Sequence, residues 1–216
     1  MARETNIDYW KKILENPTSA FQEMFDAERE FLITYILENE KVLEIGCGTG
    51  RNTETITTKT TNVIGVDSDL FTVNEFNNKF RHSSNVCAVL RGAHNLCFED
   101  NRFDVAVLFC LMPNLSDTKI QSFAEIARVL KKGGRLLLST YAETSLSSRL
   151  EMYKAVKAPI HSIDDNGKIV FQGLYEDIIS EQFSLTQLET FGDEVGLRMI
   201  SSQKVEDLAY LVVFQK

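Results

Sequence analysis

The hydrophobic pattern divides the chain into a helical beginning and a longer region of short apolar runs. In the first 40 residues, apolar side chains recur at helical spacing, and Pro17 interrupts them. Beyond this point, apolar runs alternate with polar helical stretches. The runs are "KVLEI" from Lys41, then Asn62–Asp67, Val86–Gly92, Phe103–Phe109 and Gly134–Thr140. Strands that are apolar on both faces and alternate with helices predict a parallel sheet covered on both sides.

The region after the fifth apolar run departs from this alternation. Asn166 and Gly167 lie between two apolar runs, which predicts a β-hairpin. Further on, Ser184 and Gln187 have the spacing of a capping box. They predict that a helix covers Leu185–Gly196.

Two further predictions concern how elements end and pair. The helical pattern of Thr118–Leu130 is followed by Gly133 and Gly134, which are typical of a helix C-terminus. The last two apolar runs, Arg198–Val205 and Leu208–Gln215, are separated by only two residues. They must pair antiparallel, because a parallel pair needs a crossover of about a dozen residues.

Together these elements predict an α/β chain with a Rossmann-like, doubly wound sheet in a single domain. With 216 residues, 44% of them hydrophobic and 25% charged, the chain can bury one sizeable core. Its parts are expected to be a helical N-terminal cover (1–40), a ligand-binding core (41–141), a second cover with the hairpin (142–183), and a C-terminal helix with two strands (184–216).

Charge and cysteine content narrow the possible environments. The formal net charge of −8 argues against a nucleic-acid partner. The N-terminus has no apolar signal segment and no run reaches the length of a membrane span, so we expect a cytoplasmic protein. The 4 cysteines lie far apart without a C-x-x-C pair. They predict reduced, mostly buried thiols and no metal site.

A glycine loop follows the first predicted strand. Gly46, Gly48 and Gly50 occur at alternate positions where an open α/β sheet binds its ligands, and glycine lets a backbone approach a ligand closely. The alternative is a tight turn between strand and helix. A dinucleotide loop would need glycine where the chain has Arg51, and a Walker A sequence is absent. Glu44, just before the loop, would repel phosphate but suits an ammonium or sulfonium group.

Asp67 ends the second predicted strand and follows the first loop glycine by 21 residues. This is the spacing at which a carboxylate accepts the hydroxyls of a ribose. A carboxylate can only accept hydrogen bonds, which matches a vicinal diol. The loop and Asp67 therefore predict a nucleoside ligand without a required pyrophosphate.

Four segments, in chain order, resemble successive motifs of the class I S-adenosylmethionine-dependent methyltransferases. They are "VLEIGCGTGRN", "VIGVDSD", "NLCFEDNRFDVAV" and "EIARVLKKGGRLLLST". The resemblance is strongest to the small-molecule type related to quinone-biosynthesis enzymes, and it covers about Lys41 to Tyr141. It implies a seven-stranded sheet with an antiparallel last strand, S-adenosylmethionine as cofactor, S-adenosylhomocysteine as product and a small-molecule acceptor.

The resemblance also implies which residues form the cofactor site. The glycine loop and Glu44 would lie beside the methionine part, and Asp67 would bind the ribose. Residues after the third predicted strand would frame the adenine, and those after the fourth would face the methyl-transfer side. The implied set is Glu44, Gly46, Cys47, Gly48, Gly50, Arg51, Asp67, Ser68, Ala93, His94 and Phe109.

Two departures from the family pattern stand out. Many relatives have an acidic residue where this chain has Gly92, which leaves adenine recognition to backbone groups or to His94. The N-P-P-Y sequence expected of methyltransferases that act on amino nitrogens in nucleic acids or on protein glutamine is missing. "LMPN", from Leu111 to Asn114, stands in that neighbourhood. Methylation of nucleic-acid bases is therefore disfavoured.

No catalytic residue is evident, because the methyl on a sulfonium is already activated and a positioned acceptor can suffice. Tyr141 and His161 are the candidates for a catalytic role, and the alternatives are a packing tyrosine and a surface histidine. Asn114, Tyr9 and Trp10 are candidates to face a substrate, although Tyr9 and Trp10 also suit a helix packed on the core.

The sequence leaves three functions open. The favoured one is an enzyme that methylates a small metabolite, as a monomer or homodimer. The second is a regulatory or structural protein that binds S-adenosylmethionine or S-adenosylhomocysteine without catalysis. A nicotinamide-dependent oxidoreductase is disfavoured by Arg51.

Overall fold

The computed structural model describes residues 6–172 and 178–216, with side chains from residue 10 onward. Seven strands form the main sheet. They are β1 (Val42–Ile45), β2 (Val63–Asp67), β3 (Val86–Leu90), β4 (Phe103–Phe109), β5 (Leu130–Tyr141), β9 (Arg198–Val205) and β10 (Ala209–Gln215). Their order is β3-β2-β1-β4-β5-β10-β9, and β10 pairs antiparallel with both of its neighbours. The predicted sheet with an antiparallel last strand is confirmed.

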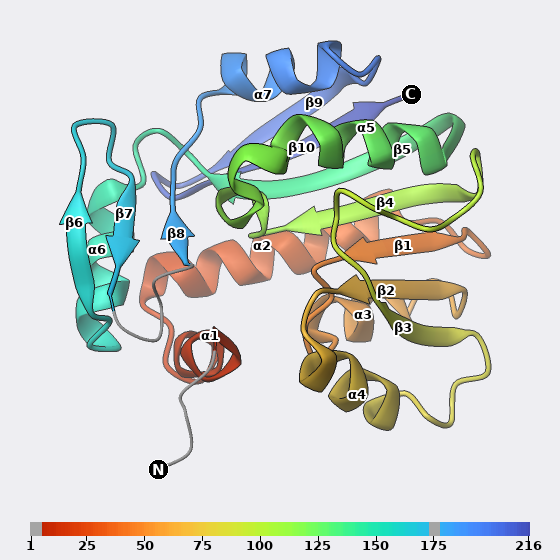
Figure 1. Cartoon of the computed structure of the whole chain (residues 1–216), viewed down its shortest axis with the longest axis horizontal. Coiled ribbons are helices and arrows are strands. Elements are labelled where there is room, and N and C mark those ends of the chain that lie inside the picture. The colour runs from red at the N-terminus through yellow and green to blue at the C-terminus, as the bar shows by residue number, and fades with distance from the viewer. Residues whose placement is uncertain (1–5, 173–177) are drawn as a thin grey trace.

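Helices cover both faces of this sheet (Figure 1). α2 (Ser19–Tyr35), α3 (Arg51–Ile56), α4 (Leu70–Lys79) and α6 (Leu146–Ala155) contribute to one apolar cluster, and α5 (Lys119–Val129) and α7 (Leu185–Asp193) to the other. Successive strand residues point to opposite clusters, as Leu136, Leu137 and Leu138 of β5 do. The doubly wound layout predicted from two-sided apolar strands is therefore confirmed. None of the described helices combines the length and apolar character needed to cross a membrane.

The remaining elements lie on the side toward which β1 and β4 point (Figure 1). α1 (Asn6–Glu15) and α2 are separated at Pro17, as the sequence predicts. β6 (Ile160–Ile163), β7 (Ile169–Phe171) and β8 (Ile179–Ser180) form a small antiparallel sheet. Its first two strands are the predicted hairpin. Gly167 has a φ of +74°, which suits glycine at this turn.

The glycine pair after α5 does not end that helix, contrary to the prediction. α5 ends at Val129, and β5 begins at the next residue. Residues 131–134 then bulge out of the ladder, because Leu130 pairs with Phe103 while Arg135 pairs with Val105. A Cβ at position 134 would lie 2.8 Å from the carbonyl oxygen of residue 131. The glycines therefore serve a β-bulge, where backbone segments approach each other closely.

The cysteine prediction is partly wrong. All four are free, as expected, but Cys87 and Cys97 are exposed, whereas Cys47 is buried and Cys110 is half-buried. Cys87 lies on β3, an edge strand on which alternate residues face solvent. Apolar composition of a run does not reveal whether its strand is central or at an edge.

We predict that Ser184→Ala lowers the free energy of unfolding by about 1 kcal/mol. Ser184 Oγ accepts from the backbone N–H of Gln187 at 3.3 Å, and Gln187 Oε1 accepts from the N–H of Ser184 at 2.8 Å. Loss of the hydroxyl leaves the N–H of Gln187, in the first turn of α7, without this acceptor. Denaturant unfolding measures the change, and Thr186→Ala, exposed in the same turn, should shift it by less than about 0.5 kcal/mol. Equal effects of the two substitutions would contradict the prediction.

Candidate functional site

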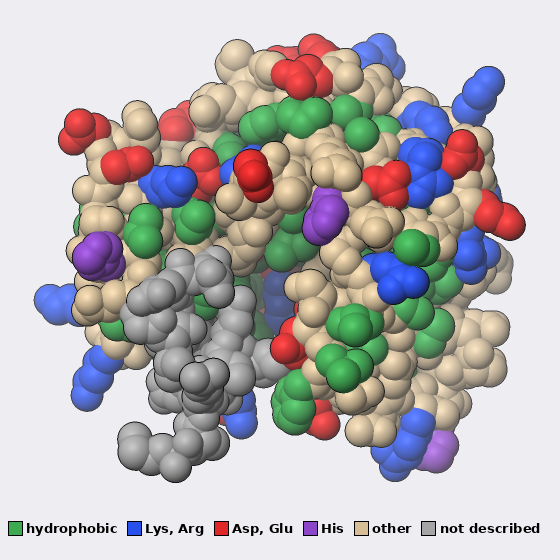
Figure 2. All heavy atoms as spheres, in the orientation of Figure 1, with side chains coloured by type: hydrophobic (Ala, Val, Ile, Leu, Met, Phe, Trp, Pro, Cys, Tyr) green, Lys and Arg blue, Asp and Glu red, His purple; other side chains and the backbone are tan. Residues whose placement is uncertain are grey.

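A cavity of about 760 Å³ opens at the carboxyl ends of β1 to β4. Figure 2 shows this face of the molecule hollowed near its centre. The cavity is lined by the loop after β1, the ends of β2, β3 and β4, one side of α1, and the 3₁₀ segment η1 (Met112–Thr118). This position is where open α/β sheets bind ligands, and the volume is that of small-molecule sites.

The glycine loop takes its shape from three left-handed residues. Gly46, Gly48 and Gly50 have φ values of +70°, +54° and +88°. A Cβ at Gly46 would lie 2.8 Å from Leu111, and one at Gly50 would collide with the ring of Phe80. At Gly48 no atom lies within 4 Å of an added Cβ. Packing therefore explains the first and third glycines, whereas Gly48 presents open backbone to the cavity.

The backbone of this loop is hydrogen-bonded to the end of β2. The N–H groups of Gly46 and Cys47 both donate to the carbonyl oxygen of Val66, at 2.8 and 3.0 Å. The N–H of Gly48 donates to Asp67 Oδ2 at 3.1 Å. Below the loop, the Cys47 side chain occupies space that a Cβ at position 65 would fill, because that Cβ would lie 2.7 Å from Sγ.

Asp67 connects the loop to the start of α4. Its Oδ1 accepts from the N–H of Asp69 at 3.0 Å, while Oδ2 accepts from Gly48. Burial raises the pKa of Asp67, and the backbone N–H groups of Asp69 and Gly48 oppose that rise. Each oxygen retains a lone pair, so the carboxylate can accept two ligand hydroxyls while it holds both turns.

The wall after β3 carries Ala93 and His94, and both line the cavity. A Cβ at Gly92 would lie 2.8 Å from Cε1 of His94. The imidazole ring of His94 therefore occupies the space that an acidic side chain at position 92 would need. Arg91 lines the cavity as well, and its N–H donates to the carbonyl oxygen of Asp67 at 2.8 Å.

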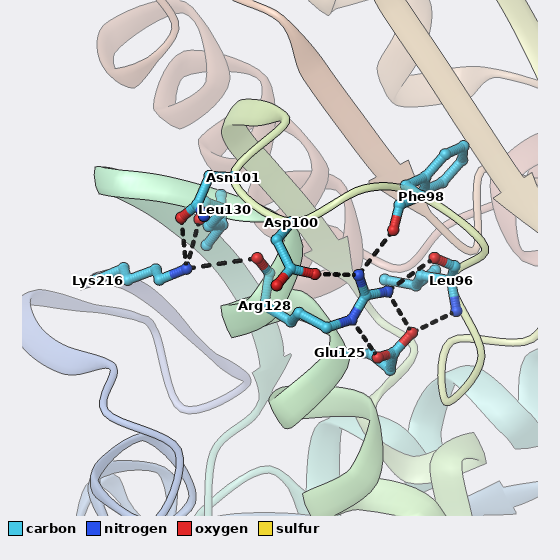
Figure 3. A network of polar contacts seen from close by, with 8 residues as sticks. All are labelled: Leu96, Phe98, Asp100, Asn101, Glu125, Arg128, Leu130 and Lys216. Carbon is cyan, nitrogen blue, oxygen red and sulfur yellow. Dashed lines mark hydrogen bonds and ion pairs between the residues drawn. The ribbon is translucent and has the colours of Figure 1, made fainter.

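Arg128 of α5 anchors the connection that continues this wall toward β4 (Figure 3). Its guanidinium donates to the carbonyl oxygens of Leu96 and Phe98, at 3.1 and 2.7 Å. It also pairs with the carboxylates of Asp100 and Glu125, each at 2.7 Å. These two carboxylates raise the pKa of Arg128. A charged, multiply bonded guanidinium therefore fixes the β3–β4 connection against α5.

Glu44 lies outside the set of cavity-lining residues, contrary to the expectation that its carboxylate faces a ligand. The residue is buried, and its Oε2 accepts a short hydrogen bond from Thr53 on α3. Oε1 has no hydrogen-bond partner within the described part of the chain. Burial raises the pKa of Glu44 to about 7, against the opposing effects of Thr53 and Arg51.

The cavity wall opposite the glycine loop comes from α1 and η1. Trp10 and Asn114, two of the substrate-facing candidates, line it, while the side chain of Tyr9 lies outside the described residues. Ser116 of η1, with a φ of +47°, and Cys110, directly after β4, with a φ of +57°, line the cavity in strained conformations. Sequence reasoning missed Lys11, Leu14 and Glu15 of α1 and residues 115–118 of η1, because their place at the cavity depends on how these two elements pack.

The two catalytic candidates do not reach this cavity. Tyr141 is buried in the core, with its ring 6.1 Å from that of Phe21 and 5.4 Å from the Arg149 guanidinium. His161 lies exposed on β6. The surface-histidine and packing-tyrosine alternatives fit these positions. None of the described residues between 142 and 183 lines the cavity either.

The structure brings most of the implied cofactor residues to one cavity. Those that line it are Gly46, Cys47, Gly48, Arg51, Asp67, Ser68, Ala93, His94 and Phe109. Glu44 and Gly50 support the loop from outside the lining. The motif spacing along the sequence thus identified the strand ends that meet at the cavity.

Residues 42–134 match the model of a family described as a methyltransferase domain. The chain is 35% identical over 103 residues to the demethylmenaquinone methyltransferase of Corynebacterium kroppenstedtii, which is 48% of this chain and 42% of that protein. It is 31% identical over 142 residues to the ubiquinone/menaquinone biosynthesis C-methyltransferase UbiE of Vibrio cholerae, which is 61% of this chain and 52% of that protein. The chain thus spans about half the length of the curated relatives it matches.

Among solved structures, the fold is similar to that of 1,6-didemethyltoxoflavin-N1-methyltransferase from Burkholderia thailandensis. The TM-score is 0.68 at 18% identity, over 97% of this chain and 81% of that chain. That structure contains 1,6-didemethyltoxoflavin and S-adenosylhomocysteine. At this identity the likeness concerns the fold.

We predict a pH-dependent stability from Glu44. Its folded-state pKa of about 7 lies above the ordinary value of 4.5, so the folded protein keeps a proton that the unfolded chain loses. Stability from this group is therefore greatest at low pH and falls as pH rises toward 7. Between pH 5 and 8, Glu44→Gln should remove a pH-dependent decline of about 2 to 3 kcal/mol in the free energy of unfolding.

Denaturant unfolding at several pH values measures this decline. Glu38→Gln, which changes an exposed glutamate, is the matched control and should retain the wild-type pH dependence. A Glu44→Gln variant with an unchanged pH profile would show that the buried carboxyl does not titrate in this range.

Proposed function

We propose that this chain is a class I, S-adenosylmethionine-dependent methyltransferase that acts on a small-molecule acceptor, and the match of residues 42–134 to the methyltransferase-domain family supports this. The methyl group comes from S-adenosylmethionine by in-line displacement, and S-adenosylhomocysteine is the product. The observation that carries the proposal is the pairing of Gly48 with Asp67. It places open, ligand-accessible backbone beside a carboxylate with free acceptor capacity in one cavity.

The order of strand ends supports this cofactor. Sheet order places the β2 and β3 ends on one side of the glycine loop and the β4 end on the other. Asp67 suits a ribose diol, and the wall of Ala93 and His94 suits an adenine next to it. The methionine part then lies over β1 and β4. S-adenosylmethionine supplies an activated methyl group, so the protein has to orient the acceptor and exclude water.

The acceptor space lies between α1 and η1. Trp10 and Leu14 supply apolar surface there, and Asn114 supplies a polar group. The relatives named for quinone biosynthesis support a flat, partly apolar acceptor for this chain too. The parts before residue 41 and between 142 and 183 are proposed as its cover. Asn114 and Lys119 contact the second part, through hydrogen bonding to the N–H of Ile179 and ion pairing with Glu181.

The proposal also includes the location, the partners and the oligomeric state of the chain. The net charge of −8 supports the absence of a nucleic-acid partner. We also propose that the enzyme is cytoplasmic and acts as a monomer or homodimer. A non-catalytic protein that binds S-adenosylmethionine or S-adenosylhomocysteine is the alternative. Turnover with an acceptor, assayed by S-adenosylhomocysteine formation, distinguishes the two.

We predict that Gly48→Val and Asp67→Ala each weaken S-adenosylhomocysteine binding at least 100-fold in calorimetry. The valine would project into the cavity, and loss of the carboxylate removes both the ribose acceptor and the acceptor for the Gly48 N–H. Gly196→Val is the matched control. Gly196 also has a positive φ, of +76°, and no atom within 4 Å of an added Cβ, but it lies after α7.

The control should cost a similar amount of stability and leave binding unchanged. Calorimetry with NAD and ATP completes the test. Binding of NAD without binding of S-adenosylhomocysteine would overturn the proposal, and normal binding by both site variants would overturn the site.

A further inference from the structure

Arg149, on α6, is the largest fully buried side chain among the described residues. Its Nε donates to Oγ of Ser145 at 3.0 Å, and its Nη1 donates to Oγ of Ser180 at 2.8 Å. Nη2 donates to the carbonyl oxygen of Gly167 at 2.8 Å and to Oε1 of Gln182 at 2.5 Å. One guanidinium therefore joins the β6–β7 turn and β8 to the start of α6 (Figure 1).

The charge of Arg149 makes these contacts important. All four acceptors are neutral oxygens. The ring of Tyr141 lies 5.4 Å from the guanidinium, and the hydroxyl of Tyr153 donates to Oγ of Ser180 at 2.6 Å. Burial lowers the pKa of Arg149, against the opposing effects of Tyr153, Tyr141 and Glu181. Because a buried cation is costly without its polar partners, the surrounding elements are held in the one arrangement that satisfies it.

β8 and the residues after it connect this network to the wall of the cavity. Successive side chains along a strand point to opposite faces. Ser180 and Gln182 reach Arg149. Glu181, between them, pairs with Lys119 at the start of α5, with Oε2 and Nζ 3.0 Å apart. The Lys119 side chain is only 14% exposed, so solvent screens this ion pair less than one on the surface.

The 3₁₀ segment η1 is held by the same strand. The N–H of Ile179 donates to Oδ1 of Asn114 at 3.4 Å. With Oδ1 engaged, the amide nitrogen of Asn114 is the part of this side chain that can donate to a ligand in the cavity. Ser116 of η1 has a strained φ of +47°, and such a conformation persists only where surrounding contacts hold it. The shape of η1 therefore depends on its support by β8.

We propose that Arg149 is a positioning residue for the acceptor side of the cavity. It fixes β8, and β8 in turn holds η1 with Asn114 in place. Neither Arg149 nor β8 lines the cavity, so the effect reaches a ligand only through η1. The contacts described for this network do not reach the glycine loop or Asp67. The inference rests on the proposed function, in which η1 faces the acceptor.

Amide hydrogen exchange of the whole protein, followed by mass spectrometry, tests this connection. Arg149→Met keeps the length of the side chain but removes its charge and its donors. It should raise exchange at least about tenfold in residues 160–171 and in residues 112–118, and less than about twofold in residues 103–109 of β4. Calorimetry should show nearly unchanged binding of S-adenosylhomocysteine, which also reports that the variant is folded.

Glu181→Gln interrupts the connection one step closer to the cavity. It weakens the contact with Lys119 and leaves the Arg149 network in place. Exchange should therefore rise about threefold or more in residues 112–118 and stay unchanged in residues 160–171. The double variant should exchange no faster in residues 112–118 than Arg149→Met alone, because both substitutions act through β8.

Two further variants complete the comparison. Arg198→Met, at an exposed arginine on β9, is the matched control and should leave exchange unchanged in all three segments. Ser180→Ala removes one acceptor of the guanidinium. It should raise exchange in both the small sheet and η1, even if Arg149→Met does not fold.

Faster exchange confined to residues 160–171 in Arg149→Met would show that this arginine stabilises the small sheet alone, and would overturn the inference. Faster exchange that extends equally to residues 103–109 would indicate a general loss of stability and would overturn it too. Additive effects in the double variant would overturn β8 as the connection. A wild-type protein that does not bind S-adenosylhomocysteine would instead overturn the proposed function, while the exchange results would still decide the role of Arg149.

Discussion

Three successive N–H groups of the glycine loop, at residues 46 to 48, are hydrogen-bonded to the end of β2, and the geometry of the cavity depends on them. Two reach the carbonyl oxygen of Val66, and the third reaches the carboxylate of Asp67. The left-handed conformations of Gly46 and Gly48 turn the chain so that these N–H groups face β2, and glycine enters that region without strain. The opposite side of the loop then remains open to a ligand, and the β1 and β2 ends become one site.

Charged groups buried behind the loop reinforce this arrangement. Glu44 accepts from Thr53 on α3, and Glu28 binds Arg51 at the start of the same helix. Each carboxylate sits where a parallel sheet and its covering helices leave little water, so each depends on a specific partner. The two sites differ in outcome. Glu44 is drawn toward its neutral form, whereas Glu28 lies against a cation that remains charged.

Local sequence patterns were reliable where neighbouring residues decide the structure. The run from Phe103 to Phe109 predicted β4 to the residue. The capping box at Ser184 predicted the first residue of α7, although the helix ends at Asp193 and not at Gly196 as expected. Patterns misled where a distant segment intervenes. The glycines at 133 and 134 resemble a helix end, yet pairing of Leu130 with Phe103 continues the strand through them. Likewise, the position of Glu44 just before the glycine loop predicts a carboxylate that faces the ligand. In the structure its side chain lies outside the cavity lining and accepts a hydrogen bond from Thr53 on α3.

The sequence by itself determined the order of elements, the two-sided apolar strands, and the spacing that brings Gly48 and Asp67 together. These follow from periodicity and from the topology of a parallel sheet, where carboxyl ends share one edge. Only the tertiary structure decided which groups face the cavity. The docking of α1 and α2 brings Trp10 to the cavity and Glu28 to Arg51, and no local pattern encodes it. Such contacts join residues far apart in the chain, and the packing of helices against the sheet selects them.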